Sequence, residues 1–158
     1  MGDSYRTAGR GAGRKIGALF AVAAMTAGLS ACGLGDDATA LGKPCSLLKA
    51  DEIQTALGQA VKDGTQAQNV CDWATDGGGK FSAGISGGGS GLFDSALRTA
   101  GGTAVSGVGD KATYAGIGQY TFIQVLKGQT NLRLDYTGPG APDEAKMTDL
   151  ARKAVSRL

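Results

Sequence analysis

Histidine is absent from this sequence of 158 residues, and with it the commonest general base of enzymes and the commonest protein ligand for metals. Proline is also scarce, with three residues against 28 glycines, which predicts many turns and few long helices. The three cysteines contain no Cys-x-x-Cys pair and are too few for a typical zinc site. The composition therefore argues against metal-dependent, thiol-redox and histidine-based catalysis.

The hydrophobic run near the N-terminus is too short to cross a bilayer. It covers residues 16–29, about 14 residues, whereas a membrane-spanning helix needs about 20. Four basic residues precede it: Arg6, Arg10, Arg14 and Lys15. A basic start, a short apolar middle and small residues at the end are typical of a secretory signal. We therefore expect residues 1–31 to be a lipoprotein signal peptide that directs export.

Four residues at the end of this run have the order of a lipobox, the signal for attaching lipid to cysteine: Leu29, Ser30, Ala31 and Cys32. Cleavage after the small Ala31 would make Cys32 the first mature residue, able to carry a diacylglyceryl thioether. We therefore expect a protein held by lipid on Cys32 at the extracytoplasmic face of the cell membrane. Two alternatives stay open. In the first, Cys32 is a buried thiol in a membrane anchor that is not cleaved. In the second, an ordinary signal peptidase cuts near the same place and releases a soluble protein.

Nucleic acid is not an expected partner. Residues 1–31 hold four of the 16 basic and one of the 14 acidic residues, which leaves 12 basic and 13 acidic residues in the mature chain. A near-neutral chain without a basic stripe has little attraction for phosphate groups. The membrane, through the lipid on Cys32, is the partner that the sequence predicts.

Two cysteines remain after lipidation, Cys45 and Cys71, and an even pair in an exported chain is typical of one disulfide. The bond would close a loop of about 25 residues and stabilise the fold by roughly 3 kcal/mol. We expect residues 32–42 to be the lipidated N-terminus and a flexible tether. Residues 43–158 are then expected to form a single globular domain.

Hydrophobic periodicity in residues 43–158 predicts an α+β domain, with three helices covering an antiparallel sheet of about five strands. The expected helices are residues 48–57, 92–100 and 142–158. The expected strands are residues 70–74, 81–85, 120–126 and 132–136, with a broken strand near 105–114. Residues 120–126 are apolar on both faces, which predicts a central strand. Alternation along residues 70–74 places Cys71 and Trp73 together on the core side.

Several short motifs resemble an actinobacterial family of lipid-anchored exported proteins, whose domain has no known function. The motifs are Pro44-Cys45-Ser46-Leu47-Leu48, Ala56-Leu57-Gly58, Cys71-Asp72-Trp73, Gly107-Val108-Gly109-Asp110-Lys111-Ala112 and a closing helix. Together they span residues 43–158. The resemblance implies the same location and fold. It supplies no active site, because that family has no established chemistry.

Two patterns suggest chemistry, and each has a simpler structural interpretation. Gly107 to Ala112 fits the dinucleotide pattern Gly-x-Gly-x-x-Gly/Ala, but the following residues do not predict the helix that such a site requires. Asp72 and Asp76 form a candidate acid–base pair, although strand alternation turns Asp72 outward into solvent. We therefore predict no catalytic, cofactor-binding or metal-binding residues.

The tyrosines offer a third candidate site, because Tyr114, Tyr120 and Tyr136 would suit the wall of a ligand cleft. Aromatic packing in the core is the default interpretation. The remaining hypothesis is a non-enzymatic binding module at the cell envelope, for an envelope protein, a wall component or a small apolar ligand. Its alternatives are a cell-envelope hydrolase using carboxylate or hydroxyl groups and a carrier of a small apolar ligand. A deep apolar cleft would favour the carrier. A cleft with two facing carboxylates would favour the hydrolase.

Lipid attachment can be tested by replacing Cys32. Because the thioether requires the thiol, a Cys32→Ala variant should accumulate as uncleaved or misprocessed precursor, while the unchanged protein partitions with membranes. Intact-mass measurement of the mature protein should show residue 32 at the N-terminus plus the mass of the lipid. A mature N-terminus elsewhere, without lipid mass, would contradict the prediction.

Overall fold

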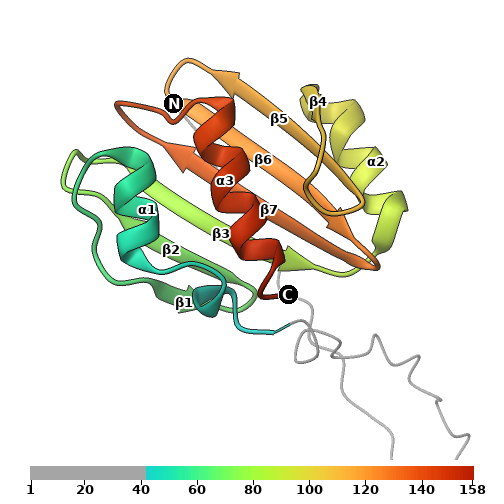
Figure 1. Cartoon of the computed structure of the whole chain (residues 1–158), viewed down its shortest axis with the longest axis horizontal. Helices are drawn as coiled ribbons and strands as arrows, with labels where there is room; N and C mark the ends of the chain where they lie inside the picture. Colours follow the sequence, from blue (N-terminus) through green and yellow to red (C-terminus); the bar gives the residue numbers. More distant parts are fainter. Residues whose placement is uncertain (1–41) are drawn as a thin grey trace, which may run out of the picture. The chain divides into compact units, whose positions relative to one another are not determined.

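The computed structural model describes residues 42–158, in which seven strands form one antiparallel sheet (Figure 1). The strand order is β1-β2-β3-β7-β6-β5-β4. The strands are β1 (Thr65–Ala67), β2 (Val70–Ala74), β3 (Lys80–Ser86), β4 (Thr103–Val105), β5 (Lys111–Ile117), β6 (Tyr120–Lys127) and β7 (Thr130–Thr137). The helices are α1 (Ala50–Leu57), α2 (Gly89–Ala100) and α3 (Glu144–Val155). The lipobox with Cys32 and the tether up to residue 41 lie outside the described residues.

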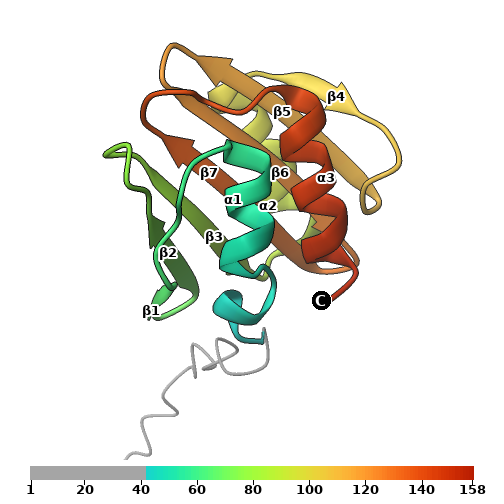
Figure 2. The same ribbon diagram turned by 60° about the vertical axis from the view of Figure 1, so that its left-hand side comes forward.

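Helices cover both faces of the sheet, but unequally. Figures 1 and 2 show α1 and α3 side by side on one face and α2 on the other. The main core lies between the sheet and the α1–α3 pair, and its largest fully buried side chains include Trp73, Tyr136, Phe81, Ile123 and Met147. Among the described residues, the members of this core run from Leu47 to Ala154.

The α+β class, the antiparallel sheet, the three helices of the described part and the disulfide are confirmed, whereas the expected number of about five strands is wrong. The two additional strands are β1 and β4, each of three residues at opposite edges of the sheet. All three residues of β1 are exposed, and so are Thr103 and Ala104 of β4. β1 has no buried face and therefore no hydrophobic alternation. In β4 only Val105 is partly buried, and the expected broken strand near residues 105–114 includes that residue alone of the three.

Helix α3 forms where the sequence predicts a core-facing helix. Asp143 is its N-cap and accepts a hydrogen bond from the backbone N–H of Lys146 at 2.9 Å. Met147, Leu150, Ala151 and Ala154 are buried against the sheet, as their spacing predicts. The expected helix continued to Leu158, but α3 ends at Val155 and the Leu158 side chain is exposed.

The disulfide joins Cys45, within a short 3-10 turn (Pro44–Ser46), to Cys71 in β2, with Cα atoms 5.0 Å apart. Cys71 and Trp73 face the same side of β2 and are both buried, as strand alternation predicts. A side chain on Gly64 would place its Cβ 2.6 Å from the Cys71 Sγ and the Trp73 Nε1, so the chain before β1 packs closely over this pair. The bond thereby fixes the segment that leads into α1 against the edge of the core.

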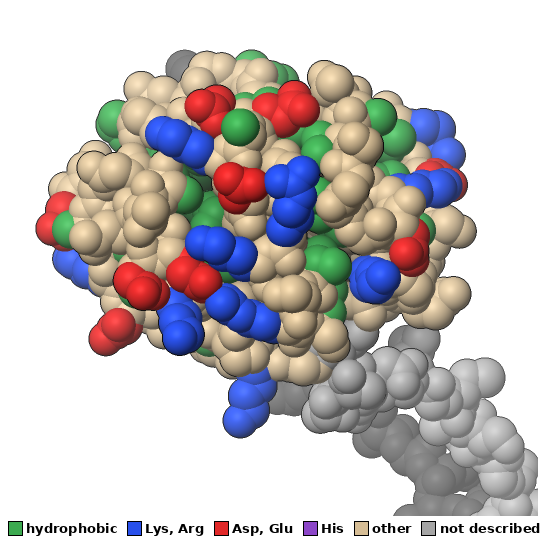
Figure 3. Space-filling model, viewed as in Figure 1, with side chains coloured by type: hydrophobic (Ala, Val, Ile, Leu, Met, Phe, Trp, Pro, Cys, Tyr) green, Lys and Arg blue, Asp and Glu red, His purple; other side chains and the backbone are tan. Residues whose placement is uncertain are grey.

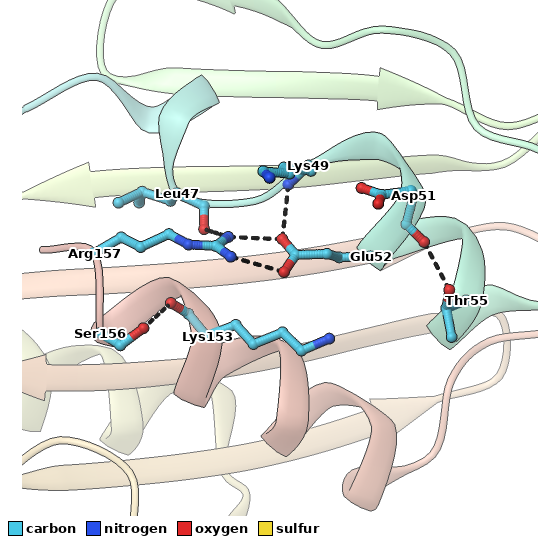
Figure 4. A network of polar contacts seen from close by, with 8 residues as sticks. All are labelled: Leu47, Lys49, Asp51, Glu52, Thr55, Lys153, Ser156 and Arg157. Atoms are coloured by element: carbon cyan, nitrogen blue, oxygen red, sulfur yellow. Dashed lines mark hydrogen bonds and ion pairs between the residues drawn. The ribbon is translucent and has the colours of Figure 1, made fainter.

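A second link joins α1 to the end of the chain (Figure 4). The Arg157 guanidinium donates to both carboxylate oxygens of Glu52, at 2.6 and 2.7 Å, and to the carbonyl oxygen of Leu47 at 2.8 Å. Glu52 also accepts from the backbone N–H of Lys49 at 3.0 Å, which satisfies a free donor at the start of α1. The bidentate hydrogen bond from Arg157 and the bond from Lys49 lower the pKa of Glu52 to about 2.

Among residues 42–158, none of the helices combines the length and apolar character that crossing a membrane requires.

The disulfide should contribute measurably to stability. Replacing both Cys45 and Cys71 by alanine removes a crosslink between residues 26 positions apart. Opening such a loop should lower the free energy of unfolding by roughly 3 kcal/mol in urea denaturation. Thiol labelling of the unfolded, unreduced parent protein should modify neither cysteine. Two reactive thiols, or unchanged stability of the double variant, would contradict this prediction.

The Glu52–Arg157 pair should make stability depend on pH. Because the pKa of Glu52 is about 2 in the folded state and near 4.5 when unfolded, the unfolded state binds more protons between these values. The stabilisation is therefore present above about pH 5 and is lost as the pH falls toward 2. Arg157→Gln should lower the free energy of unfolding by about 1.5–3 kcal/mol at pH 7 and flatten its slope between pH 5 and 2.

Arg152→Gln is the matched control for Arg157→Gln. Arg152 pairs with Asp149 on the same helix, and both side chains are more than half exposed. Surface pairs of this kind contribute about 0–1 kcal/mol. Equal losses of stability in the two variants would show that the Glu52–Arg157 pair does not provide the stabilisation. An unchanged dependence of the free energy of unfolding on pH between 5 and 2 in Arg157→Gln would show the same.

Candidate functional site

An apolar cleft lies between α2 and the β4–β5 edge of the sheet, and is here named the α2 cleft. Its volume is about 330 Å³. The residues that line it are Phe93, Asp94, Leu97, Gly102, Ala104, Val105, Lys111, Ala112 and Thr113. Five of the nine have apolar side chains, contributed by the helix on one side and by the two strands on the other. The cleft therefore offers a mainly apolar wall with few polar groups, the usual composition of a small-molecule site.

Helix α2 is attached more lightly than α3. Phe93 is its one large buried side chain, whereas Leu92 is 44 % exposed. Its N-cap is Gly88, which supplies no side-chain hydrogen bond, and its C-cap is Gly101. The carbonyl oxygen of Gly89 accepts from the buried Asn131 Nδ2 at 3.0 Å, which fixes the start of the helix to β7. A helix with one large buried side chain and glycine at both ends is held less firmly than the rest of the fold. Segments that cover ligands usually come from such less stable regions.

The rim of the α2 cleft carries one ion pair. Lys111 Nζ lies 3.3 Å from the Asp94 Oδ1, and the two side chains are 53 % and 45 % exposed. Deeper in the cleft the Thr113 hydroxyl donates to the carbonyl oxygen of Thr103 at 3.2 Å, so it is already satisfied. The polar groups that a ligand would meet first are therefore the two charged ends at the rim.

Gly102 sets the close approach of the two strands that form the cleft wall. Its φ is +133°, and an added Cβ would lie 2.5 Å from the Thr113 Oγ1 and 2.8 Å from the carbonyl oxygen of Tyr114. Only glycine avoids this clash with backbone and side chain. Gly102, which lies just after the expected helix of residues 92–100, thus also allows β4 to pair with β5.

Two other clefts flank α3, and in the one between α1 and α3 the acidic groups are paired with arginine. A cleft of about 190 Å³ between α1 and α3 contains Glu52 and Asp149. Glu52 is bound by Arg157, and the Asp149 carboxylate accepts from Arg152 at 2.9 Å. On this face of the molecule acidic and basic side chains are interspersed (Figure 3). A carboxylate held ionised by arginine is poorly suited to act as a general acid at neutral pH.

A polar cluster covers part of the sheet face that α2 leaves open. Arg133 lies 4.2 Å from the centre of the Phe122 ring, and its Nε donates to the Asp135 Oδ1 at 2.9 Å. Its Nη2 donates to the Tyr120 hydroxyl at 2.6 Å, and Tyr120 in turn donates to Asp135. Burial, and then the hydrogen bond to Asp135, raise the pKa of Tyr120. The tyrosine stays neutral and the arginine shields Phe122, which is consistent with a structural role.

The sequence-based candidates for chemistry are not brought together. Gly107 to Asp110 form a loop that leads directly into β5, so no helix N-terminus follows the glycine pattern. Asp72 lies on the open sheet face and accepts from the Ser82 hydroxyl at 2.6 Å, as the outward orientation predicts. Asp76 lies in the turn four residues later. Among residues 42–158, the side-chain partners of Asp72 are Lys80 and Ser82, and no hydrogen bond connects the two acids.

The three tyrosines likewise do not share a cleft. Tyr136 is fully buried, and its hydroxyl donates to the carbonyl oxygen of Pro139 at 2.6 Å and accepts from Gln59. Tyr114 is half-buried near α3, and its hydroxyl donates to the carbonyl oxygen of Pro142 at 3.3 Å. Tyr120 lies on the opposite face of the sheet, in the Arg133 cluster.

One motif with catalytic spacing escaped the sequence interpretation: Ser46 and Lys49 form a Ser-x-x-Lys. In hydrolases that use this motif, the lysine assists the serine nucleophile. Here the Ser46 hydroxyl donates to the carbonyl oxygen of Lys43 at 2.7 Å, and Lys49 stands before the start of α1. Within residues 42–158 no hydrogen bond joins the two side chains, so the motif lacks the geometry that its chemistry requires.

The α2 cleft itself was not predicted. Its members come from α2, β4 and β5, and most are ordinary apolar residues without a spacing signal. The one hint in the sequence is glycine near both ends of α2, at Gly88, Gly89, Gly101 and Gly102.

No family model, no curated protein and no solved structure matches this chain. The resemblance to the actinobacterial lipoprotein family therefore stays a prediction from the residues quoted above.

Proposed function

We propose that this chain is an exported lipoprotein, held by lipid on Cys32 at the extracytoplasmic face of the cell membrane, whose domain is a non-enzymatic binding module. The α2 cleft carries the binding part of this proposal. It combines an apolar wall, a volume of about 330 Å³ and a lightly attached covering helix. The anchoring part rests on the basic residues, the short apolar run and the order Leu29, Ser30, Ala31, Cys32.

The size of the α2 cleft favours a small apolar ligand, and hence the carrier form of a binding module. At about 330 Å³ it lies at the lower end of the range of about 300–1,000 Å³ that is usual for small-molecule sites. It is roughly twice the size of an engineered apolar cavity of about 150 Å³ that binds benzene. A ligand with a short chain or two fused rings matches this space.

The location gives such a carrier access to apolar molecules. A tether of about ten residues would span about 20 Å as a flexible chain, since its mean length is about 5–6 Å times the square root of the residue number. The domain would thus stay near the bilayer surface, where apolar molecules are concentrated. The resemblance to lipid-anchored exported proteins supports the same arrangement.

The hydrolase alternative has less support from the described residues. Asp94 in the α2 cleft forms an ion pair with Lys111. In the cleft between α1 and α3, Glu52 and Asp149 form ion pairs with Arg157 and Arg152. The pKa of Glu52 is lowered to about 2, the opposite direction from that required of a general acid. The Ser46–Lys49 motif and the Asp72–Asp76 pair lack catalytic geometry.

Binding of a neutral apolar probe tests the proposed function. The protein is prepared from residue 32 onward with Cys32→Ser, so that no attached lipid competes, and is titrated with N-phenyl-1-naphthylamine. We expect saturable fluorescence enhancement by the parent protein. Ala104→Phe should weaken binding by about tenfold or more, equivalent to about 1.4 kcal/mol, because the ring fills the cleft from an exposed position.

Ala115→Phe is the matched control, with the same substitution on the neighbouring strand β5 but outside the α2 cleft. It should bind the probe like the parent protein. Absence of saturable binding by the parent, or equal binding by both variants, would refute the assignment of the α2 cleft as the binding site.

A further inference from the structure

We infer that the ligand of the α2 cleft is a small amphipathic anion, with an apolar chain lying in the cleft and a carboxylate head bound by Lys111. This inference rests on the proposed function and names the class of ligand. A purely apolar occupant would leave the charges at the rim unused, whereas an amphipathic one would engage both parts of the site. The sign of the head group follows from the charges at the mouth of the cleft.

Lys111 is positioned to bind such a head group. It is the first residue of β5, it lines the α2 cleft, and its side chain is 53 % exposed. A lysine side chain can lay its methylene stem along apolar surface while its ammonium group remains in water. The ammonium group has three donors, and the structure assigns one partner to it, the Asp94 carboxylate at 3.3 Å.

The existing partner of Lys111 can be exchanged at small cost. The Lys111–Asp94 pair is about half exposed on both sides, and pairs of this kind contribute about 0–1 kcal/mol. Asp94 also has a second basic neighbour, because Arg98 follows it by four residues on α2. Side chains at this spacing lie next to each other on a helix surface. Arg98 can therefore take over Asp94 when a ligand carboxylate binds Lys111.

The charged groups around the mouth favour an anion over a cation. Helix α2 contributes Asp94 and Arg98, β5 contributes Lys111, and β4 contributes none, since its sequence is Thr-Ala-Val. Glu144 lines the clefts on the α3 side of β4 and does not line the α2 cleft. Of the residues that line the cleft, Lys111 and Asp94 carry opposite charges that balance each other. Arg98 lies one helical turn beyond Asp94 and adds a positive charge, so the net charge of this edge complements a carboxylate.

Three ligands with the same apolar chain separate the contribution of the head group. Isothermal titration of the Cys32→Ser protein with octanoate, 1-octanol and octylammonium at low ionic strength compares an anion, a neutral head and a cation. We expect octanoate to bind about three- to tenfold more tightly than 1-octanol, and octylammonium to bind most weakly. Added salt should reduce this preference, because the pair is exposed.

Single charge changes then assign the effect to Lys111. Lys111→Gln should weaken octanoate about three- to tenfold while leaving 1-octanol unchanged. Asp94→Asn should strengthen octanoate and further weaken octylammonium, because it removes the competing acid. Lys127→Gln is the matched control. Lys127 has the same 53 % exposure and a similar aspartate partner, Asp110 at 3.7 Å, but it does not line the α2 cleft, so octanoate binding should not change.

The outcomes distinguish this inference from the function on which it rests. If neither N-phenyl-1-naphthylamine nor any octyl compound binds, the proposed function fails and the inference fails with it. If the neutral compounds bind but octanoate is not preferred, the inference alone is overturned. The same holds if Lys111→Gln and Lys127→Gln behave alike, or if octylammonium binds best.

Discussion

The burial of strand β6 on both of its faces is the constraint on which the rest of the structure depends. Ile123 and Val125 point toward α3, while Phe122 and Leu126 point to the opposite side, and all four are nearly inaccessible to solvent. A strand of this kind needs cover on two sides, because exposed apolar area costs about 25 cal/mol per Å². The chain meets this need with three helices that it distributes unequally between the two faces.

The unequal cover divides the domain into a firmly held side and a lightly held side. On the first, α1 and α3 bury a continuous core, and the Cys45–Cys71 disulfide and the Glu52–Arg157 pair connect both ends of the described chain to it. On the second, α2 shields β6 mainly through Phe93, and the Arg133 guanidinium covers Phe122 beyond the reach of the helix. Stability is thus concentrated away from the α2 cleft, which leaves that side free to accommodate a ligand.

Much of the fold follows from local patterns in the sequence. The period of the apolar residues predicted the positions of β2, β3, β6, β7 and α3. The spacing of two residues between Cys71 and Trp73 placed both side chains in the core. β1 escaped prediction, and β4 was anticipated only through Val105, where the expected broken strand begins. Both strands are short and mostly exposed, so they leave almost no periodic signal. They form because a neighbouring strand offers backbone partners, which is a property of the folded sheet and not of their own residues.

The sequence by itself determined the α+β class, the pairing of Cys45 with Cys71 and the outward position of Asp72, because each depends on residue type and on spacing along one segment. Only the tertiary structure decided that Arg157 meets Glu52 across 105 residues, and that Lys111 and Asp94 meet at the rim of an apolar cleft. Such contacts depend on how separate elements pack. A spacing pattern encodes which face of an element is buried, but it does not encode which distant element will cover that face.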